Sequence, residues 1–86
     1  MSAYSDILVK RIEEFLKKRN DLSVNALADM SGVAQSTLNS ILHGESENPK
    51  IQTLHKIALA FGMTLAEFLD YEEMNMYSFE DDETIS

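Results

Sequence analysis

The sequence predicts an all-α fold of five helices in one domain. Apolar residues recur at helical spacing through most of the 86 residues, and no stretch has the alternating pattern that is typical of a strand. Glycines and short polar segments divide the chain at short intervals, as expected for a small helical bundle. A chain of this length can bury a single modest core.

The first helix is predicted over residues 5–19. Ser5 is expected to cap its start, and Asp6 suits the positive end of the helix dipole. The run Lys17-Lys18-Arg19 falls in the last turn, where cations suit the dipole, and it could equally hold a phosphate as the chain turns. The apolar stripe consists of Leu8, Ile12, Phe15 and Leu16.

Two short helices joined by a tight turn are predicted over residues 24–43. Ser23 is a good N-cap for the first, and Gly32 can take the left-handed conformation that would end it. Ala28 allows two helices to cross closely, and Val33 fills the turn. This spacing of small and apolar residues is typical of a helix-turn-helix. The buried side of the second helix consists of Leu38, Ile41 and Leu42, and Gly44 ends it.

The outward side of that second helix is polar and carries no acidic residue. Ser36, Ser40 and His43 recur at i, i+4 and i+7, with Gln35 and Asn39 beside them. Such a helix can enter the major groove and offer amides and hydroxyls to base edges. A solvated helix face is the alternative for any one of these residues, and the whole pattern favours nucleic-acid recognition.

Two more helices complete the predicted bundle. One covers residues 51–61, after the turn at Pro49, and Gly62 is expected to close it. Thr64 and Glu67 form a predicted capping box for a short last helix. The apolar positions of the two helices are Ile51, Leu54, Ile57, Ala58 and Phe61, followed by Leu65, Phe68 and Leu69.

The charge is unevenly distributed. The net charge of −8 is unusual for a DNA-binding protein. Residues 1–65 contain all seven basic residues and seven acidic ones, which cancel, whereas residues 66–86 contain the other eight acidic residues and no basic one. The chain is therefore a neutral body with an acidic tail.

The tail over residues 71–86 allows three interpretations. Its acidic residues are interrupted by Met74, Met76, Tyr77 and Phe79. It could be a flexible extension kept soluble by its charge. Its methionines and aromatic residues could instead dock on a neighbouring copy and assist dimer formation. It could also cover the DNA-reading surface of its own chain.

Several function classes are disfavoured. The chain has no cysteine, and no apolar run approaches the roughly 18 residues of a membrane span. The N-terminus lacks a signal-peptide pattern, so a cytoplasmic location is expected. His43 and His55 lie on different predicted helices without partners, so no metal site or other cofactor is expected. No arrangement of nucleophile and base or of paired carboxylates suggests an enzyme.

The segment over residues 22–70 resembles the phage-repressor and Cro-like helix-turn-helix family of the xenobiotic-response-element type. The matching residues are Gly32-Val33, the run Gln35-Ser36-Thr37-Leu38, Gly44, Asn48-Pro49, Thr53-Leu54, Ile57-Ala58 and Phe61-Gly62. The resemblance implies a five-helix lambda-repressor-like DNA-binding domain over residues 1–70, followed by an acidic C-terminal extension over residues 71–86. It also implies a homodimer that binds double-stranded DNA and regulates transcription, without a small-molecule cofactor or a membrane.

The same resemblance assigns roles to individual residues. Gln35 begins the recognition helix, which covers residues 35–43, and its amide could bond base edges. Ser36 and Ser40 match other base-facing positions. The positions near the sugar-phosphate backbone are Thr37, Asn39, Lys17 and Lys50.

The chain also departs from the family pattern. Val24 stands where many relatives carry a phosphate-binding Gln or Arg, and Ala34 replaces the usual Ser or Thr cap of the recognition helix. Ser31 stands where an apolar residue is usual, and Glu45 and Glu47 occupy a loop that is often basic. Few phosphate contacts are therefore expected, so binding should be weak and salt-sensitive. A protein-interaction module on the same fold, such as an antitoxin-like or regulatory partner, is the alternative.

Overall fold

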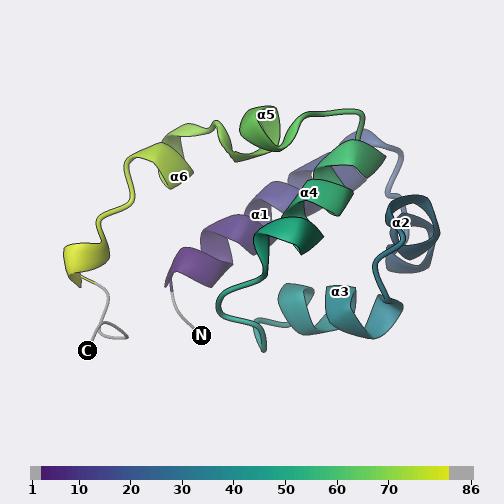
Figure 1. Cartoon of the computed structure of the whole chain (residues 1–86), viewed down its shortest axis with the longest axis horizontal. Coiled ribbons are helices and arrows are strands. Elements are labelled where there is room, and N and C mark those ends of the chain that lie inside the picture. The colour runs from purple at the N-terminus through teal and green to yellow at the C-terminus, as the bar shows by residue number, and fades with distance from the viewer. Residues whose placement is uncertain (1–2, 82–86) are drawn as a thin grey trace.

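The computed structural model describes residues 3–81 as a small helical bundle without a strand, as predicted (Figure 1). Its elements are α1 (Ala3–Lys18), α2 (Val24–Ser31), α3 (Gln35–Leu42), α4 (Ile51–Ala60), α5 (Leu65–Leu69), α6 (Glu72–Asn75) and the 3₁₀ helix η1 (Phe79–Asp81). The five predicted helices are all present, and the short α6 follows them. None of the helices described is long and apolar enough to cross a membrane.

One core holds the bundle together. Helix α4 packs against α2 and α5, and α3 packs against α1 and α2. The predicted apolar stripes therefore converge on one interior, where each fully buried Leu, Ile or Phe side chain contributes roughly 1.5–3 kcal/mol. The core consists of Leu8, Ile12, Leu27, Val33, Leu38, Ile41, Leu54, Ile57, Ala58, Phe61 and Phe68.

One prediction for a single residue was wrong, and one of the apolar positions lies outside the core. Ser5 does not cap the first helix, because α1 begins before it and the residue lies buried within the helix. Ile51 is not part of the core, because it is the first residue of α4 and its side chain is 61 % exposed. Ile51 satisfies the apolar spacing, but it lies at the edge of the stripe, one turn before Leu54 takes up the contact with the core.

Two arginines, Arg11 within α1 and Arg19 directly after it, bind the C-terminal ends of other helices. Arg11 donates to the carbonyls of Phe68 (Nε, 2.8 Å) and Glu67 (Nη2, 3.0 Å) in α5. Arg19 Nη2 donates to the carbonyl of Phe61 at the end of α4 (2.8 Å). The last carbonyls of a helix have no partner within it and carry the negative end of its dipole. Both guanidinium groups therefore serve the fold.

The described part of the acidic extension packs on α1. The Tyr71 hydroxyl donates to the carbonyl of Ile7 (3.1 Å), and Lys10 forms an ion pair with Glu73 (3.4 Å between Nζ and Oε2). Both Lys10 and Glu73 are at least half exposed, so this pair contributes little, roughly 0–1 kcal/mol. Figure 1 places α6 and η1 beside the N-terminal half of α1, at the opposite end of the molecule from α2.

An aromatic cluster packs the end of this segment against α1. The rings of Tyr4, Tyr77 and Phe79 lie with their centroids 4.7 to 5.6 Å apart, a separation that favours tilted and edge-to-face contacts. Residues 71–81 thus form a strap over α1 of the same chain. In Figure 1 the ribbon of the strap lies apart from that of α3, and residues 82–86 of the predicted tail lie outside the described residues.

The Tyr71 contact predicts a change at high pH. Burial raises the pKa of the Tyr71 hydroxyl to about 12, against the opposing effect of the nearby Arg11 charge. Because the folded chain favours the neutral phenol, this contribution to stability should be complete below the ordinary value of about 10 and lost as pH rises through 12. Absorbance of tyrosinate should show a step near pH 12 that the Tyr71→Phe variant lacks. A wild-type titration that is complete near pH 10 would contradict this expectation.

Candidate nucleic-acid interface

The elbow between α2 and α3 is built from local backbone contacts. Ser23 Oγ accepts the N–H of Ala26 (3.0 Å) and caps α2, as predicted. Gly32 has a φ of 76°, and its N–H donates to the carbonyl of Ala28 (2.9 Å), which confirms the left-handed end of α2. The space around Gly32 is open, so only its backbone conformation requires glycine.

Ser31 has a role in the same elbow. Its Oγ accepts the N–H of Val33 (3.2 Å), and the Val33 side chain is buried as predicted. The Ser31 hydroxyl therefore accepts a hydrogen bond from a backbone N–H in the turn that has no partner within a helix. This contact gives a physical reason for serine at a position where the family usually has an apolar residue.

Helix α3 divides into a buried side and an exposed side. Leu38 and Ile41 lie in the core, where they fix the orientation of the helix. Outside the core, the first turn of α3 presents exposed Gln35, Ser36 and Thr37. The remaining predicted site residues of this helix are the partly buried Asn39 and Ser40 and the exposed C-cap residue His43.

Lys50 lies beside the exposed side of α3. It is the exposed N-cap residue of α4, and it lines a cavity of about 330 Å³ together with Thr37 of α3. The structure therefore brings two predicted backbone-binding residues together. The other residues that line this cavity are Ile41, Ser46, Asn48, Pro49 and Thr53.

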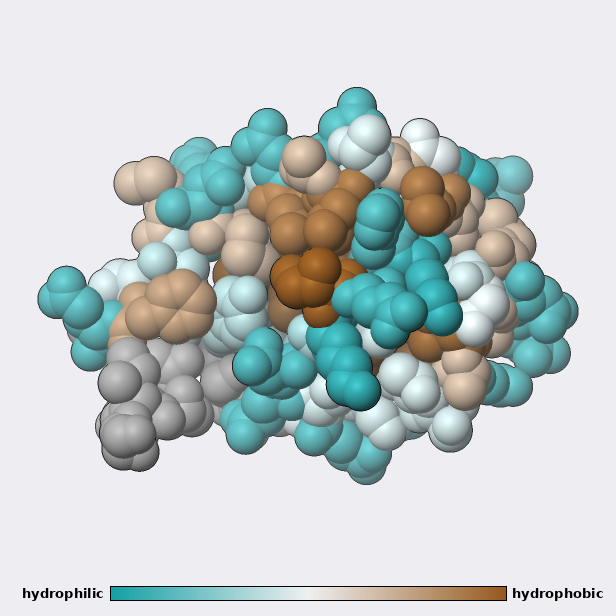
Figure 2. Space-filling view, viewed as in Figure 1, coloured by the Kyte–Doolittle hydropathy of each residue, from teal (hydrophilic) through white to brown (hydrophobic). Residues whose placement is uncertain are grey.

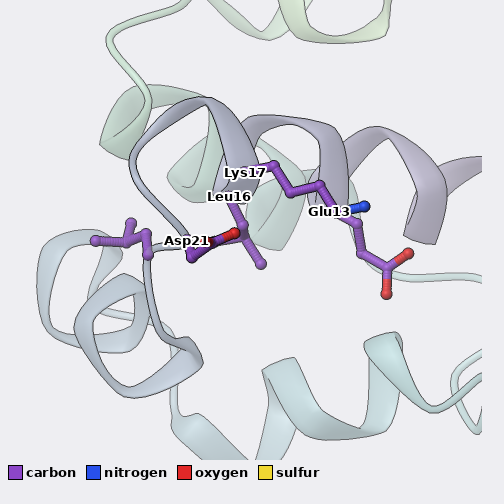
Figure 3. A pocket seen from close by; sticks show the side chains of 5 residues that line it. Glu13, Leu16, Lys17 and Asp21 are labelled. Carbon is purple, nitrogen blue, oxygen red and sulfur yellow. The ribbon is translucent and has the colours of Figure 1, made fainter.

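Lys17 lies in a different place. It belongs to a cavity of about 250 Å³ between the end of α1 and the start of α2, where Glu13 and Asp21 are its neighbours (Figure 3). The remaining lining residues are Leu16 and Leu22. Two carboxylates line this cavity and none lines the cavity of Lys50, so Lys17 is a weaker candidate for binding phosphate.

The family of the chain follows from this architecture together with its sequence. Residues 11–73 match the Cro/C1-type HTH DNA-binding domain. The chain belongs to the Cro/C1-type helix-turn-helix family. This assignment confirms the resemblance, and it agrees with the prediction that the protein is not an enzyme, because the family is one of DNA-binding domains.

Two curated relatives of this Cro/C1-type domain come from Bacillus subtilis (strain 168). The HTH-type transcriptional regulator SlrR is 37 % identical over 67 residues, which cover 78 % of this chain and 44 % of SlrR. The HTH-type transcriptional regulator SinR is 32 % identical over 68 residues, which cover 79 % of this chain and 60 % of SinR. The chain thus spans about half the length of these relatives.

A solved structure confirms the fold. The crystal structure of the prophage Lp1 protein 11 superposes with a TM-score of 0.76 at 27 % sequence identity, covering 90 % of this chain and all of that one. The agreement extends beyond the helix-turn-helix to nearly the whole Cro/C1-type chain.

The sequence did not indicate a site role for several polar residues of this Cro/C1-type domain. Ser46, Asn48 and Thr53 share the cavity of Lys50, next to the first turn of α4. Their only sequence signal is their position around Pro49, where a loop restarts as a helix with unpaired N–H groups. Among residues 3–81, no three His, Asp or Glu side chains gather in a metal-binding arrangement.

The missing cap of α3 predicts a stabilising substitution. Ala34 provides no side-chain hydrogen bond to the first turn, although its backbone is non-helical, as the N-cap position requires (φ −58°, ψ 140°). Ala34→Ser should therefore raise the free energy of unfolding by about 0.5–2 kcal/mol. Urea denaturation followed by circular dichroism would measure it. Ala66→Ser, at an exposed position within α5, is the control, and an equal effect of both substitutions would argue against capping.

Proposed function

We propose that the chain is a sequence-specific DNA-binding transcriptional regulator that acts as a homodimer. In this proposal residues 1–70 form the DNA-binding domain and residues 71–86 form an acidic C-terminal extension. The observation that carries it is the exposed side of α3, which is polar, free of acidic residues and fixed by buried Leu38 and Ile41. The Cro/C1-type match over residues 11–73 includes this helix, and two relatives are named as transcriptional regulators.

The side chains of α3 have complementary roles in this proposal. The amide of Gln35 can donate to and accept from a base edge in the major groove, and the hydroxyls of Ser36 and Ser40 can do either. The residues that would contact the sugar-phosphate backbone or the groove edge are Thr37, Asn39, His43, Lys17 and Lys50. No cofactor is required for these contacts.

The supply of cations limits the affinity. Arg11 and Arg19 bind helix carbonyls, and Lys10 is paired with Glu73. The remaining basic residues are Lys17, Lys18, Lys50 and Lys56. Each phosphate that the protein neutralises in duplex DNA makes the slope of log K against log salt concentration more negative by roughly 0.9. Because one chain offers few phosphate contacts, we expect a single copy to bind DNA with only modest affinity.

A fluorescence titration at low salt tests the proposal. The full chain is added to a labelled duplex taken from upstream of its own coding sequence and, separately, to an unrelated duplex of the same length. We expect the upstream duplex to bind at least tenfold tighter, since specific and non-specific sites typically differ by about 10³ or more. Equal affinity for the two duplexes would contradict sequence-specific regulation through that site.

The second candidate function is a protein-interaction module on the same fold. The acidic side chains of Glu45 and Glu47 are exposed in the loop between α3 and α4, near the predicted phosphate-binding face. Val24 packs partly buried against the core instead of offering a hydrogen bond to phosphate. If the folded chain binds neither duplex even at low salt, this second function is favoured.

A further inference from the structure

The strap is held on α1 by residues that recur along one face of that helix. Tyr4, Ile7 and Arg11 follow one another at i, i+3 and i+7, so they share a face. The Ile7 carbonyl accepts from the Tyr71 hydroxyl (3.1 Å), and the Arg11 guanidinium lies 4.5 Å from the centre of the Tyr71 ring. These three residues of α1, together with Lys10 one turn after Ile7, are here called the α1 face.

The α1 face offers three kinds of contact. Its tyrosine ring belongs to the aromatic cluster, its backbone supplies a carbonyl acceptor, and its lysine, with a side chain that is 63 % exposed, meets one carboxylate. The complementary groups are an aromatic ring, a hydroxyl donor and a carboxylate. The strap carries them in Tyr77 and Phe79, in Tyr71 and in Glu73. The face therefore suits an acidic segment with aromatic side chains.

The strap is only loosely attached to this face. No side chain in residues 71–80 is fully buried, and Met76 and Phe79 are 76 % and 50 % exposed. Met74 alone reaches the edge of the core, where it is partly buried. Figure 2 shows apolar side chains interspersed with hydrophilic ones at the end of the molecule where Figure 1 places the strap. Segments with so few buried apolar contacts open locally at a low cost in free energy.

Charge also works against the closed strap. Residues 71–81 contain four acidic residues and no basic one. Among its glutamates, Glu73 is the one that forms an ion pair with another described residue, and that pair is exposed. Like charges gathered on one short segment repel each other, which weakens the attachment of the strap. A segment that brings the same aromatic groups and one well-placed carboxylate, with fewer unpaired charges, would compete with it.

We propose that the α1 face is a docking site for an acidic, aromatic segment of a partner protein, which takes the place of the strap. The inference does not rest on the proposed function, because Figure 1 places this half of α1 at the opposite end of the molecule from α2 and apart from α3. A partner on the α1 face leaves the exposed side of α3 open. The strap acts as an internal competitor, which sets how much partner is needed to occupy the site.

Fluorescence anisotropy with a labelled peptide tests the docking site on the full chain. The probe is a synthetic peptide with the sequence of residues 70–81. Because the chain has a net charge of −8, general electrostatic attraction does not hold an acidic peptide to it. Substituting Tyr77 and Phe79 by alanine weakens the strap and leaves the α1 face intact. We expect this double variant to bind the peptide roughly tenfold to a hundredfold tighter than wild type, in which only the open fraction of molecules can bind.

Matched substitutions locate the bound peptide. Added to the double variant, Lys10→Glu should weaken peptide binding about fivefold, because a carboxylate then opposes that of the peptide. Lys18→Glu makes the same change in charge at the other end of α1 and should leave the affinity unchanged. Tyr4→Ala should weaken binding roughly tenfold, since it removes the ring on which the aromatic side chains pack. A peptide of the same composition in scrambled order is the control, and circular dichroism verifies that all variants fold.

The outcomes separate exchange from a fixed strap. Equal affinity for wild type and the double variant would overturn the docking site, as would insensitivity to both Lys10→Glu and Tyr4→Ala. No binding to wild type at roughly a thousandfold the peptide concentration that saturates the double variant would also overturn it, because the strap would then be a permanent part of the fold. Light scattering provides the last check, because wild-type dimers that the strap substitutions abolish would assign the face to the strap of a second copy. Peptide binding by a chain that binds no DNA would support the docking site and remove the proposed function alone.

Discussion

Phe68→Ala should lower the free energy of unfolding by about 3–5 kcal/mol, the cost of emptying a large buried site. Phe68 is fully buried and is the main side chain that α5 contributes to the core. Its ring lies 6.1 Å from that of Phe15 and 6.0 Å from the Arg11 guanidinium, measured between centres. Small domains have only about 5–15 kcal/mol of stability in total. The variant should therefore lose a large part of its stability and unfold at a much lower urea concentration.

The expected effect is large because Phe68 is the one fully buried side chain of α5, whereas Leu65 and Leu69 are only partly buried. The Phe68 carbonyl accepts from Arg11 Nε (2.8 Å), so the loss of the ring also loosens a charge-assisted hydrogen bond from α1. Phe79→Ala is the matched control, because Phe79 is 50 % exposed in the strap. Urea denaturation of both variants would measure the difference. A cost for Phe68→Ala no greater than that for Phe79→Ala would contradict this account of the core.

Local signals in the sequence predicted most of the helix ends. Ser23, Gly32 and the capping box of Thr64 and Glu67 act through contacts within a few residues, so their structural effect can be read from neighbouring positions. The capping box is complete, with Glu67 N–H donating to Thr64 Oγ1 (3.0 Å) and Thr64 N–H donating to Glu67 Oε1 (2.9 Å). Regular apolar spacing in turn predicted the helices themselves.

Contacts between distant segments could not be predicted in the same way. The strap depends on Tyr71 reaching Ile7, which lies 64 residues earlier in the chain. Arg19 is among three basic residues that suit a helix end equally well in the sequence, and only the folded position of Phe61 selects it. Ser5 is a residue type that often caps a helix, but α1 begins at Ala3, which places Ser5 inside the helix and on its buried side. The exposure of Gln35, Ser36 and Thr37 was easier to predict, because it follows from the positions of the apolar residues within the same helix.

Substitution of both Gln35 and Ser36 by alanine should abolish the preference for the operator while leaving the fold intact. Both side chains are exposed and neither contributes to the core. A well-placed contact to a base edge contributes about 1–3 kcal/mol of discrimination, and a homodimer would lose it in each half-site. The preference is measured as the ratio of Kd for an unrelated duplex to Kd for the operator.

The control distinguishes base reading from general attraction to DNA. Gln52→Ala removes another exposed glutamine, on α4, and should leave the ratio unchanged. Lys50→Gln should instead weaken binding to both duplexes by a similar factor, because a phosphate contact carries no sequence information. If the Gln35 and Ser36 substitutions left the ratio at its wild-type value, the exposed side of α3 would not be the surface that reads the base pairs.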